Sequence, residues 1–209
     1  MRVRKKKHGA ERLAACAGIL CERPQAPLPA GERPLWLEIG CGKGGFACGM
    51  AAAHPEVSFY AMEKISDVLV IAAERAMAMG RACPDNLRFL RADARDLAEW
   101  FAPGSLAGIF LNFSDPWPKA GHAKRRLTYR GFLASYFTLL ADNGFLAFKT
   151  DNEGLFTFTL EELAAIGRTP LWQTDDLHAS PYAEGNIMTE YEKNFTALGM
   201  PIHALRVLK

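Results

Sequence analysis

Residues 35–45 read LWLEIGCGKGG, an apolar run followed directly by a glycine-rich loop. The apolar run at 35–39 has the length and composition of a buried strand, and residues 44–53 predict a helix. Glycine tolerates positive φ and lets a backbone approach a ligand closely, so Gly40 and Gly42 suit a loop that wraps a ligand at a helix N-terminus. The loop matches G-x-G-x-x-G, which occurs at dinucleotide sites and also at adenosyl-cofactor sites.

Short apolar runs alternate with longer amphipathic stretches after this loop. Strands that alternate with helices predict a doubly wound α/β fold with a mostly parallel, seven-stranded sheet. The last strand follows a short connection and is expected to be antiparallel. Residues 189–192 fit the capping-box pattern Ser/Thr-x-x-Glu and predict a helix start. The expected strands are 35–39, 57–62, 87–90, 106–112, 144–149, 171–174 and 202–208, and the main helices are 44–53, 66–79, 130–141 and 153–166.

Length and composition fit one such domain. The chain has 209 residues, of which 49% are hydrophobic and 23% charged, enough for one well-buried α/β domain but not for two. Residues 1–33 begin with a basic cluster and continue with several prolines, so they are predicted to form a basic arm and linker before a domain at 34–209. No long apolar stretch follows the basic start, as a secretory signal requires, and none has the length of a membrane span. Five cysteines without metal-ligand spacing predict reduced thiols in a cytoplasmic protein with no metal site.

Acidic residues follow successive expected strands. Glu63 lies where an acid can accept both ribose hydroxyls, Asp93 lies where an acid meets an adenine edge, and Asp115 follows the fourth strand. Each has a plainer alternative: Glu63 as a solvated residue before a helix, and Asp93 as a cap of the turn at Arg95. Because ligands bind at the carboxyl ends of such strands, the whole set together with the glycine loop favours a nucleoside site.

Glu38 separates the two cofactor classes. A carboxylate just before the glycine loop repels a pyrophosphate but suits a cation such as the amino group or sulfonium of S-adenosylmethionine. The chain is also too short for the substrate domain of a usual nicotinamide-dependent oxidoreductase. We therefore prefer S-adenosylmethionine as the cofactor, with an NAD(P)-dependent oxidoreductase as the alternative.

A rigid polar corner follows the fourth expected strand. Residues 112–119 read NFSDPWPK, and their two prolines are expected to push Asp115 and Trp117 toward extended conformations. Cations follow at Lys124, Arg125 and Arg126, which we predict to contact the phosphates of a polyanionic ligand such as RNA, with a steep dependence on salt. Trp117 either stacks on a base or packs the corner, and the flanking prolines favour packing.

Four motifs together resemble bacterial tRNA (guanine-N7)-methyltransferases over essentially the whole chain. They are LEIGCG at 37–42, NFSDPWPK at 112–119, KTDN at 149–152 and NIMTEYE at 186–192. The resemblance implies a class I methyltransferase that methylates N7 of a variable-loop guanine in tRNA. It implies cofactor contacts from Glu38, Glu63, Asp93 and Asp115, and substrate contacts from Lys119, Asp151, Thr189, Glu190, Tyr191 and Glu192. Residues 120–123 (AGHA) are less basic than the family leads us to expect.

The expected reaction needs no general base, because guanine N7 carries a lone pair and no proton. Asp115 is therefore expected to hold the methyl donor and to stabilise the positive charge that develops on the purine. Asp151 or Glu192 is the candidate for reading the guanine N1–H and N2–H₂ donors, against the alternatives that Asp151 caps the next helix and that Glu192 only completes a capping box.

Two further readings stay open. One is a methyltransferase that acts on another base or on a protein, although the corner lacks the Asn/Asp-Pro-Pro-Tyr/Phe pattern of amine-methylating enzymes. Another is an RNA-binding module without activity, against which the intact row of acids argues. The sequence leaves the oligomeric state open between monomer and homodimer.

Overall fold

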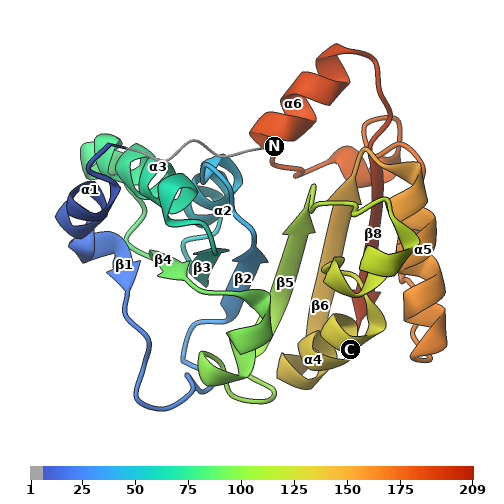
Figure 1. Ribbon diagram of the computed structural model, residues 1–209, viewed down its shortest axis with the longest axis horizontal. Helices are drawn as coiled ribbons and strands as arrows, with labels where there is room; N and C mark the ends of the chain where they lie inside the picture. Colours follow the sequence, from blue (N-terminus) through green and yellow to red (C-terminus); the bar gives the residue numbers. More distant parts are fainter. Residues whose placement is uncertain (1–6) are drawn as a thin grey trace.

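The computed structural model describes residues 7–209, and within this range the chain forms one eight-stranded sheet covered by helices (Figure 1). The strand order is β1-β4-β3-β2-β5-β6-β8-β7. Neighbouring strands run parallel except at β8, which is antiparallel to both β6 and β7, so the expected antiparallel last strand is confirmed. The strands are β1 (Leu20–Cys21), β2 (Leu35–Ile39), β3 (Ser58–Glu63), β4 (Leu87–Arg91), β5 (Leu106–Asn112), β6 (Leu140–Thr150), β7 (Trp172–Thr174) and β8 (His203–Leu208).

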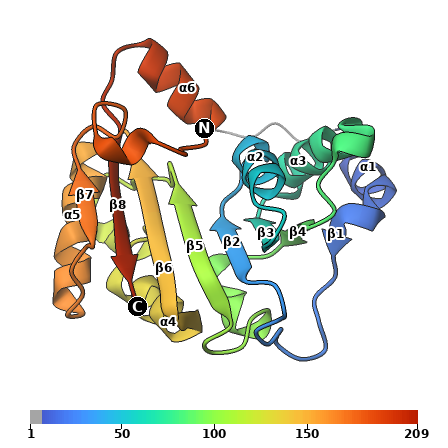
Figure 2. The same cartoon turned by 180° about the vertical axis from the view of Figure 1, so that it is seen from behind.

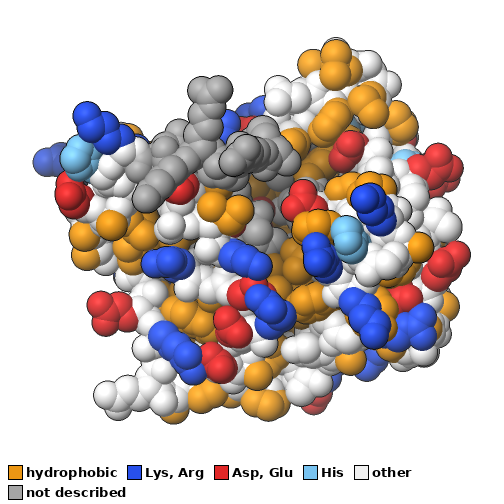
Figure 3. Space-filling view, viewed as in Figure 1, with side chains coloured by type: hydrophobic (Ala, Val, Ile, Leu, Met, Phe, Trp, Pro, Cys, Tyr) orange, Lys and Arg blue, Asp and Glu red, His pale blue; other side chains and the backbone are white. Residues whose placement is uncertain are grey.

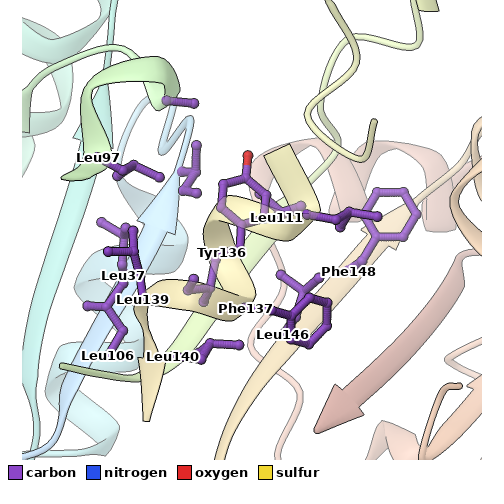
Figure 4. Close-up of a cluster of buried hydrophobic side chains, with 14 of the residues drawn as sticks. Leu37, Leu97, Leu106, Leu111, Tyr136, Phe137, Leu139, Leu140, Leu146 and Phe148 are labelled. Atoms are coloured by element: carbon purple, nitrogen blue, oxygen red, sulfur yellow. The ribbon is translucent and has the colours of Figure 1, made fainter. Parts of the chain in front are cut away.

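Helices lie on both faces of this sheet, as a doubly wound fold requires (Figure 2). On one face α2 and α3 pack with Phe59 and Phe89, and on the other α4 and α5 pack on β5 and β6. Figure 4 shows part of the core on the α4 side of the sheet, where Leu111 of β5, Phe148 of β6 and Tyr136 of α4 belong to one cluster of buried side chains. The helices are α1 (Gly9–Ala15), α2 (Gly45–Ala53), α3 (Ser66–Ala78), α4 (Arg130–Leu139), α5 (Glu153–Ala165) and α6 (Glu190–Ala197), with 3₁₀ turns η1 (Ala17–Ile19), η2 (Gly80–Ala82), η3 (Ala94–Glu99), η4 (Ala120–Arg125) and η5 (Pro181–Ala183).

The extra strand, β1, corrects the expectation of seven strands, and residues 9–21 form α1, η1 and β1 before the proline-rich stretch. Strand β1 pairs in parallel with β4, and Cys16 and Ile19 are only 4% exposed in the core. Arg12 of α1 donates two hydrogen bonds to Glu74 of α3, at 2.7 and 2.6 Å. A two-residue strand is too short to produce a period-2 pattern, so the sequence could not reveal it. The basic residues 2–6 lie outside the described range.

Helix α6 lies across the carboxyl ends of β5 and β6, above the edge of the sheet at which the parallel strands end (Figure 1). Its predicted capping box is confirmed: the Thr189 hydroxyl accepts from the Glu192 N–H at 3.0 Å, and the Glu192 carboxylate accepts from the Thr189 N–H at 3.2 Å. None of the helices within residues 7–209 is both long and apolar enough to cross a membrane.

Candidate functional site

The glycine loop after β2 is open on one side. Gly40 and Gly42 have φ of +81° and +56°, and a Cβ added at either would meet no atom within 4 Å. Gly44 has a different role, because a Cβ there would lie 2.9 Å from the Ala72 Cβ of α3. The loop therefore uses Gly44 to pack α2 closely on α3 and leaves its Gly40–Gly42 edge open to a ligand.

Glu38, the fourth residue of β2, is a buried acid with one oxygen unpartnered. Its side chain belongs to a residue that is 2% exposed, and Oε1 accepts from Asn112 Nδ2 at 2.9 Å. Oε2 is buried and has no hydrogen-bond partner among the described residues. Burial raises the pKa of Glu38 to about 7, against the opposing effects of the Asn112 hydrogen bond and the Lys149 charge. A buried oxygen without a donor is costly, and a cationic amino group is the kind of partner that would satisfy it.

Glu63 ties the glycine loop to the start of α3. Its Oε2 accepts from the Gly42 N–H at 3.2 Å and its Oε1 from the Ile65 N–H at 2.9 Å. Burial raises the pKa of Glu63, and these backbone bonds oppose the shift. The alternative of a merely solvated residue is therefore wrong. Each oxygen keeps a free lone pair, so the carboxylate can still accept from ribose hydroxyls.

Asp93, after β4, is saturated by its own neighbours. Oδ1 accepts from the Arg95 N–H and Nε at 3.0 and 2.9 Å, while Oδ2 accepts from Arg95 Nη2 at 2.9 Å and lies 2.8 Å from Lys64 Nζ. The Arg95 hydrogen bonds are the largest of the effects that hold the pKa of Asp93 well below its usual range. The turn-capping interpretation is confirmed. A contact to adenine stays a prediction that requires one of these four donors to move away.

The corner after β5 exposes Asp115 but folds differently from the expectation. Trp117 has φ of +42°, not the extended conformation that the following proline favours, and Phe113 has φ of +51°. The cause is Arg126, whose Nε and Nη2 donate to the carbonyls of Pro116 and Trp117 at 2.9 and 3.0 Å. The Trp117 ring has the Arg125 guanidinium 5.0 Å from its centroid, in line with a packing role.

The basic residues beyond the corner divide into two kinds. Arg126 is half-buried and bonded to the corner, with its guanidinium over the Phe158 ring at 4.2 Å, so it braces the corner, and its phosphate contact stays a prediction. Lys119, Lys124 and Arg125 are exposed. Lys and Arg side chains gather around the middle of the molecular face in Figure 3. A surface pocket of about 320 Å³ lies beside them and is lined by Ala94, Arg95, Lys124, Tyr129, Gly131, Phe132 and Ser135.

Asp151 has a carboxylate that is not engaged within residues 7–209, where no hydrogen bond or ion pair to it is found. The cap of α5 is Asn152, whose side chain accepts from the Leu155 N–H at 2.7 Å. The capping alternative for Asp151 is therefore wrong, and its half-exposed carboxylate lies just beyond the carboxyl end of β6.

Glu192 has the opposite environment. Its side chain is 0% exposed and accepts from Lys149 Nζ and Asn186 Nδ2, both at 2.7 Å, as well as from the Thr189 N–H. The capping-box alternative is thus confirmed, and the carboxylate is used within the protein. Asp151 is the candidate with a carboxylate available to a guanine edge.

The remaining residues of the 189–192 motif differ in exposure. Thr189 is buried, with only 7% of its surface exposed. Glu190 forms an ion pair with Arg75 of α3. Tyr191 is 51% exposed, and its ring is nearly parallel to that of Phe113, at an interplanar angle of 17°. The Tyr191 ring is therefore presented beside the Asp115 corner.

Sequence reasoning missed four residues of this region: Asn112, Lys149, Asn186 and His178. Asn112 binds Glu38, Lys149 and Asn186 bind Glu192, and His178 Nε2 lies 3.1 Å from Glu192 Oε1. A lysine that ends an otherwise apolar strand was the available signal for Lys149. No local pattern marked His178, since only the fold brings it to α6.

The open glycine loop and the acids at successive strand ends define a class I, S-adenosylmethionine-dependent methyltransferase. Residues 32–205 match a family described as putative methyltransferase. The chain belongs to the tRNA (guanine-N(7)-)-methyltransferase family, whose named members include proteins of Exiguobacterium sibiricum and Lachnoclostridium phytofermentans. They are 46% and 48% identical to it over 174 and 178 residues, each spanning 83% of this chain and 80% of the relative. A third relative, from Lactococcus lactis subsp. cremoris, is 42% identical over 98% of this chain and 96% of its own.

Solved structures agree on the fold. The 16S rRNA methyltransferase KamB has a TM-score of 0.62 at 13% identity, covering 99% of this chain and 95% of its own. A 16S rRNA (adenine(1408)-N(1))-methyltransferase of Catenulisporales acidiphilia, determined with its cosubstrate SAM, has a TM-score of 0.56 at 17% identity, covering 98% and 92%. At such identities the likeness concerns the fold alone.

Proposed function

We propose that this protein transfers the methyl group of S-adenosylmethionine to N7 of a guanine in the variable loop of tRNA, and that it does so in the cytoplasm. The relatives named above are tRNA (guanine-N(7)-)-methyltransferases. The observation that carries the proposal is the exposed carboxylate of Asp115, displayed on a braced corner at the strand edge where Glu38 has an oxygen without a hydrogen-bond partner among the described residues.

The residues present fit the cofactor. Glu38 offers its Oε2 to the amino group, Gly40 and Gly42 form an open backbone edge, and Glu63 can accept from the ribose. When bound, the cofactor supplies an electrophilic methyl group on a sulfonium. The protein's own task is to align guanine N7 with that group and to exclude water.

Asp115 stabilises the charge that moves during the transfer. The N7–carbon bond forms while the sulfur–carbon bond breaks, so positive charge passes to the purine and no proton has to leave N7. A fixed carboxylate beside both partners stabilises this charge without acting as a base. Asp151 accepts from N1–H and N2–H₂, a donor pair that adenine lacks, while Lys119 and Thr189 complete the substrate contacts.

Replacing the target atom tests the reaction directly. A tRNA transcript with 7-deazaguanine at the acceptor position lacks the N7 lone pair, so we expect no methyl transfer to it, and full transfer to the guanine-containing control. Unchanged transfer to the 7-deaza transcript would show that another atom is methylated, which is the alternative of a methyltransferase acting elsewhere on RNA.

The exposed cations predict salt-dependent RNA binding. Lys124→Ala/Arg125→Ala removes two candidate phosphate contacts, so the slope of log Kd against log salt should become shallower by roughly 1.4 to 1.8. Fluorescence anisotropy of labelled tRNA between 50 and about 200 mM salt measures this slope.

Arg33→Ala/Arg81→Ala is the matched control, because both arginines are exposed and lie away from the corner. Its slope should equal that of the wild type. An unaltered slope in the Lys124/Arg125 variant would place the RNA on another surface.

Tyr191 predicts a stacking contact with the target purine. An aromatic platform contributes about 1–3 kcal/mol per stacked base, so Tyr191→Ala should raise the KM for tRNA about 5- to 150-fold while Tyr191→Phe stays near the wild type. Steady-state methyl transfer measures both. Leu198→Ala, at the far end of α6 and 73% exposed, is the control and should change nothing. Equal KM values for Tyr191→Ala and the control would exclude stacking.

A further inference from the structure

Lys149 is a buried lysine that the proposed chemistry does not use. It lies one residue before the end of β6 and is 8% exposed, and burial lowers its pKa. Its Nζ donates to Asn186 Oδ1 at 2.9 Å, to the Ile187 carbonyl at 3.1 Å and to Glu192 Oε2 at 2.7 Å. An ammonium has three hydrogens, and all three are directed at the 186–192 segment.

The same residue also faces the cofactor half of the site. Lys149 pairs in register with Asn112, the residue that binds Glu38, and the Lys149 carbonyl accepts from the Phe113 N–H at 2.9 Å where the Asp115 corner begins. The Lys149 charge also acts on the Glu38 carboxylate. Thus the Lys149 side chain is bonded to the segment proposed to hold guanine, and its place in β6 is directly beside Asn112, which binds the carboxylate proposed to hold the methyl donor.

We infer that Lys149 is a positioning residue shared by both halves of the site, which fixes the 186–192 segment over the sheet through Glu192 and Asn186 and supplies the compensating charge for Glu38. The inference rests on the proposed function for its substrate half. Its cofactor half concerns Glu38 alone and does not depend on which RNA atom is methylated.

The charged surroundings of both groups are defined. Glu38 faces Asn112 from β5, Lys149 from β6 and Glu63 from β3. The Cys41 thiol of the glycine loop and the Cys48 thiol of α2 also face it. Lys149 faces Glu192 from α6, behind which lies His178, and it also lies 5.1 Å from the centre of the Phe46 ring of α2. Lys149 is therefore the cation whose loss should make Glu38 harder to ionise.

Two variants break the same ion pair but differ in the charge left near Glu38. Lys149→Met removes the cation, whereas Glu192→Gln keeps it. Calorimetric titration with S-adenosylmethionine, without RNA, should show wild-type affinity rising with pH until Glu38 ionises near 7. In Lys149→Met this rise should move about one pH unit upward, giving roughly tenfold weaker binding at pH 6.5, while in Glu192→Gln it should not move upward.

The substrate half is read from steady-state methylation of tRNA at pH 8.5, with saturating cofactor. Both variants should raise the KM for tRNA, since both release the 186–192 segment.

If Lys149→Met does not fold, the double variant Lys149→Met/Glu192→Met takes its place. It replaces the ion pair by apolar side chains, a change that often preserves stability, and it should retain the upward movement of the cofactor-binding pH profile. An unmoved profile in the Met variants, or an equal upward movement in Glu192→Gln, would overturn the role assigned toward Glu38. An unchanged KM for tRNA would overturn the role toward the substrate segment, whereas a wild-type protein that leaves guanine N7 unmethylated would instead reject the proposed function.

Discussion

Asp115→Asn should lower kcat about 10²- to 10³-fold while leaving the melting temperature unchanged. The carboxylate lies exposed on the corner and makes no hydrogen bond or ion pair within residues 7–209, so its loss costs the fold little. What is lost is the fixed negative charge beside the purine as positive charge develops there. Single-turnover methyl transfer with saturating tRNA measures the chemical step, and thermal unfolding measures the fold.

Asp142→Asn is the matched control for this substitution. Asp142 is 98% exposed and lies near the start of β6, at the opposite end of the strand from the site. Its variant should turn over like the wild type. A near-normal kcat for Asp115→Asn would contradict the electrostatic role.

Glu38→Gln should weaken S-adenosylmethionine binding about 30-fold to 5 × 10³-fold, because removing one partner of a buried, hydrogen-bonded charge pair costs about 2–5 kcal/mol. The Gln side chain keeps an oxygen for Asn112 but offers no charge to a cationic ligand. Calorimetry at pH 8, where wild-type Glu38 is ionised, gives the comparison. Equal affinities would remove Glu38 from the cofactor site.

The stability of the same variant gives an independent check. Burial raises the pKa of Glu38 from 4.5 to about 7 in the folded protein, so the folded state binds more protons than the unfolded state between these values. The neutral Glu38 side chain therefore contributes its full share of the free energy of unfolding, about 3 kcal/mol, below pH 4.5. This contribution is lost as pH rises through 7. Glu38→Gln, which stays neutral, should lack this component, and chemical denaturation at pH 5 and pH 8 measures it.

Local pattern was sufficient to predict most of the fold. The strand, glycine loop and helix at 35–53 and the capping box at Thr189 depend on periodicity and on hydrogen bonds between near neighbours, and both are found. Strand β1 was missed because its pairing with β4 is a tertiary event that leaves too short a pattern. The corner was predicted in place but not in conformation, since Arg126 overrides the preference of the residue before a proline.

The candidate site divides in the same way. Strand-end acids follow from topology, so Glu38, Glu63 and Asp115 could be predicted as site candidates from their positions along the chain. Which carboxylates are free did not follow from the sequence: Asp93 is saturated by Arg95 and Lys64, and Glu192 is enclosed with Lys149. Such pairings depend on side chains from separate elements, and no spacing rule reports them.

The central claim is tested most directly by locating the transferred methyl group. The wild-type protein is incubated with isotopically labelled S-adenosylmethionine and unmodified tRNA, and the RNA is then digested and its nucleosides are identified by mass. The account predicts a single labelled product, 7-methylguanosine, from one variable-loop position. Label in any other nucleoside, or none in the RNA, would contradict it.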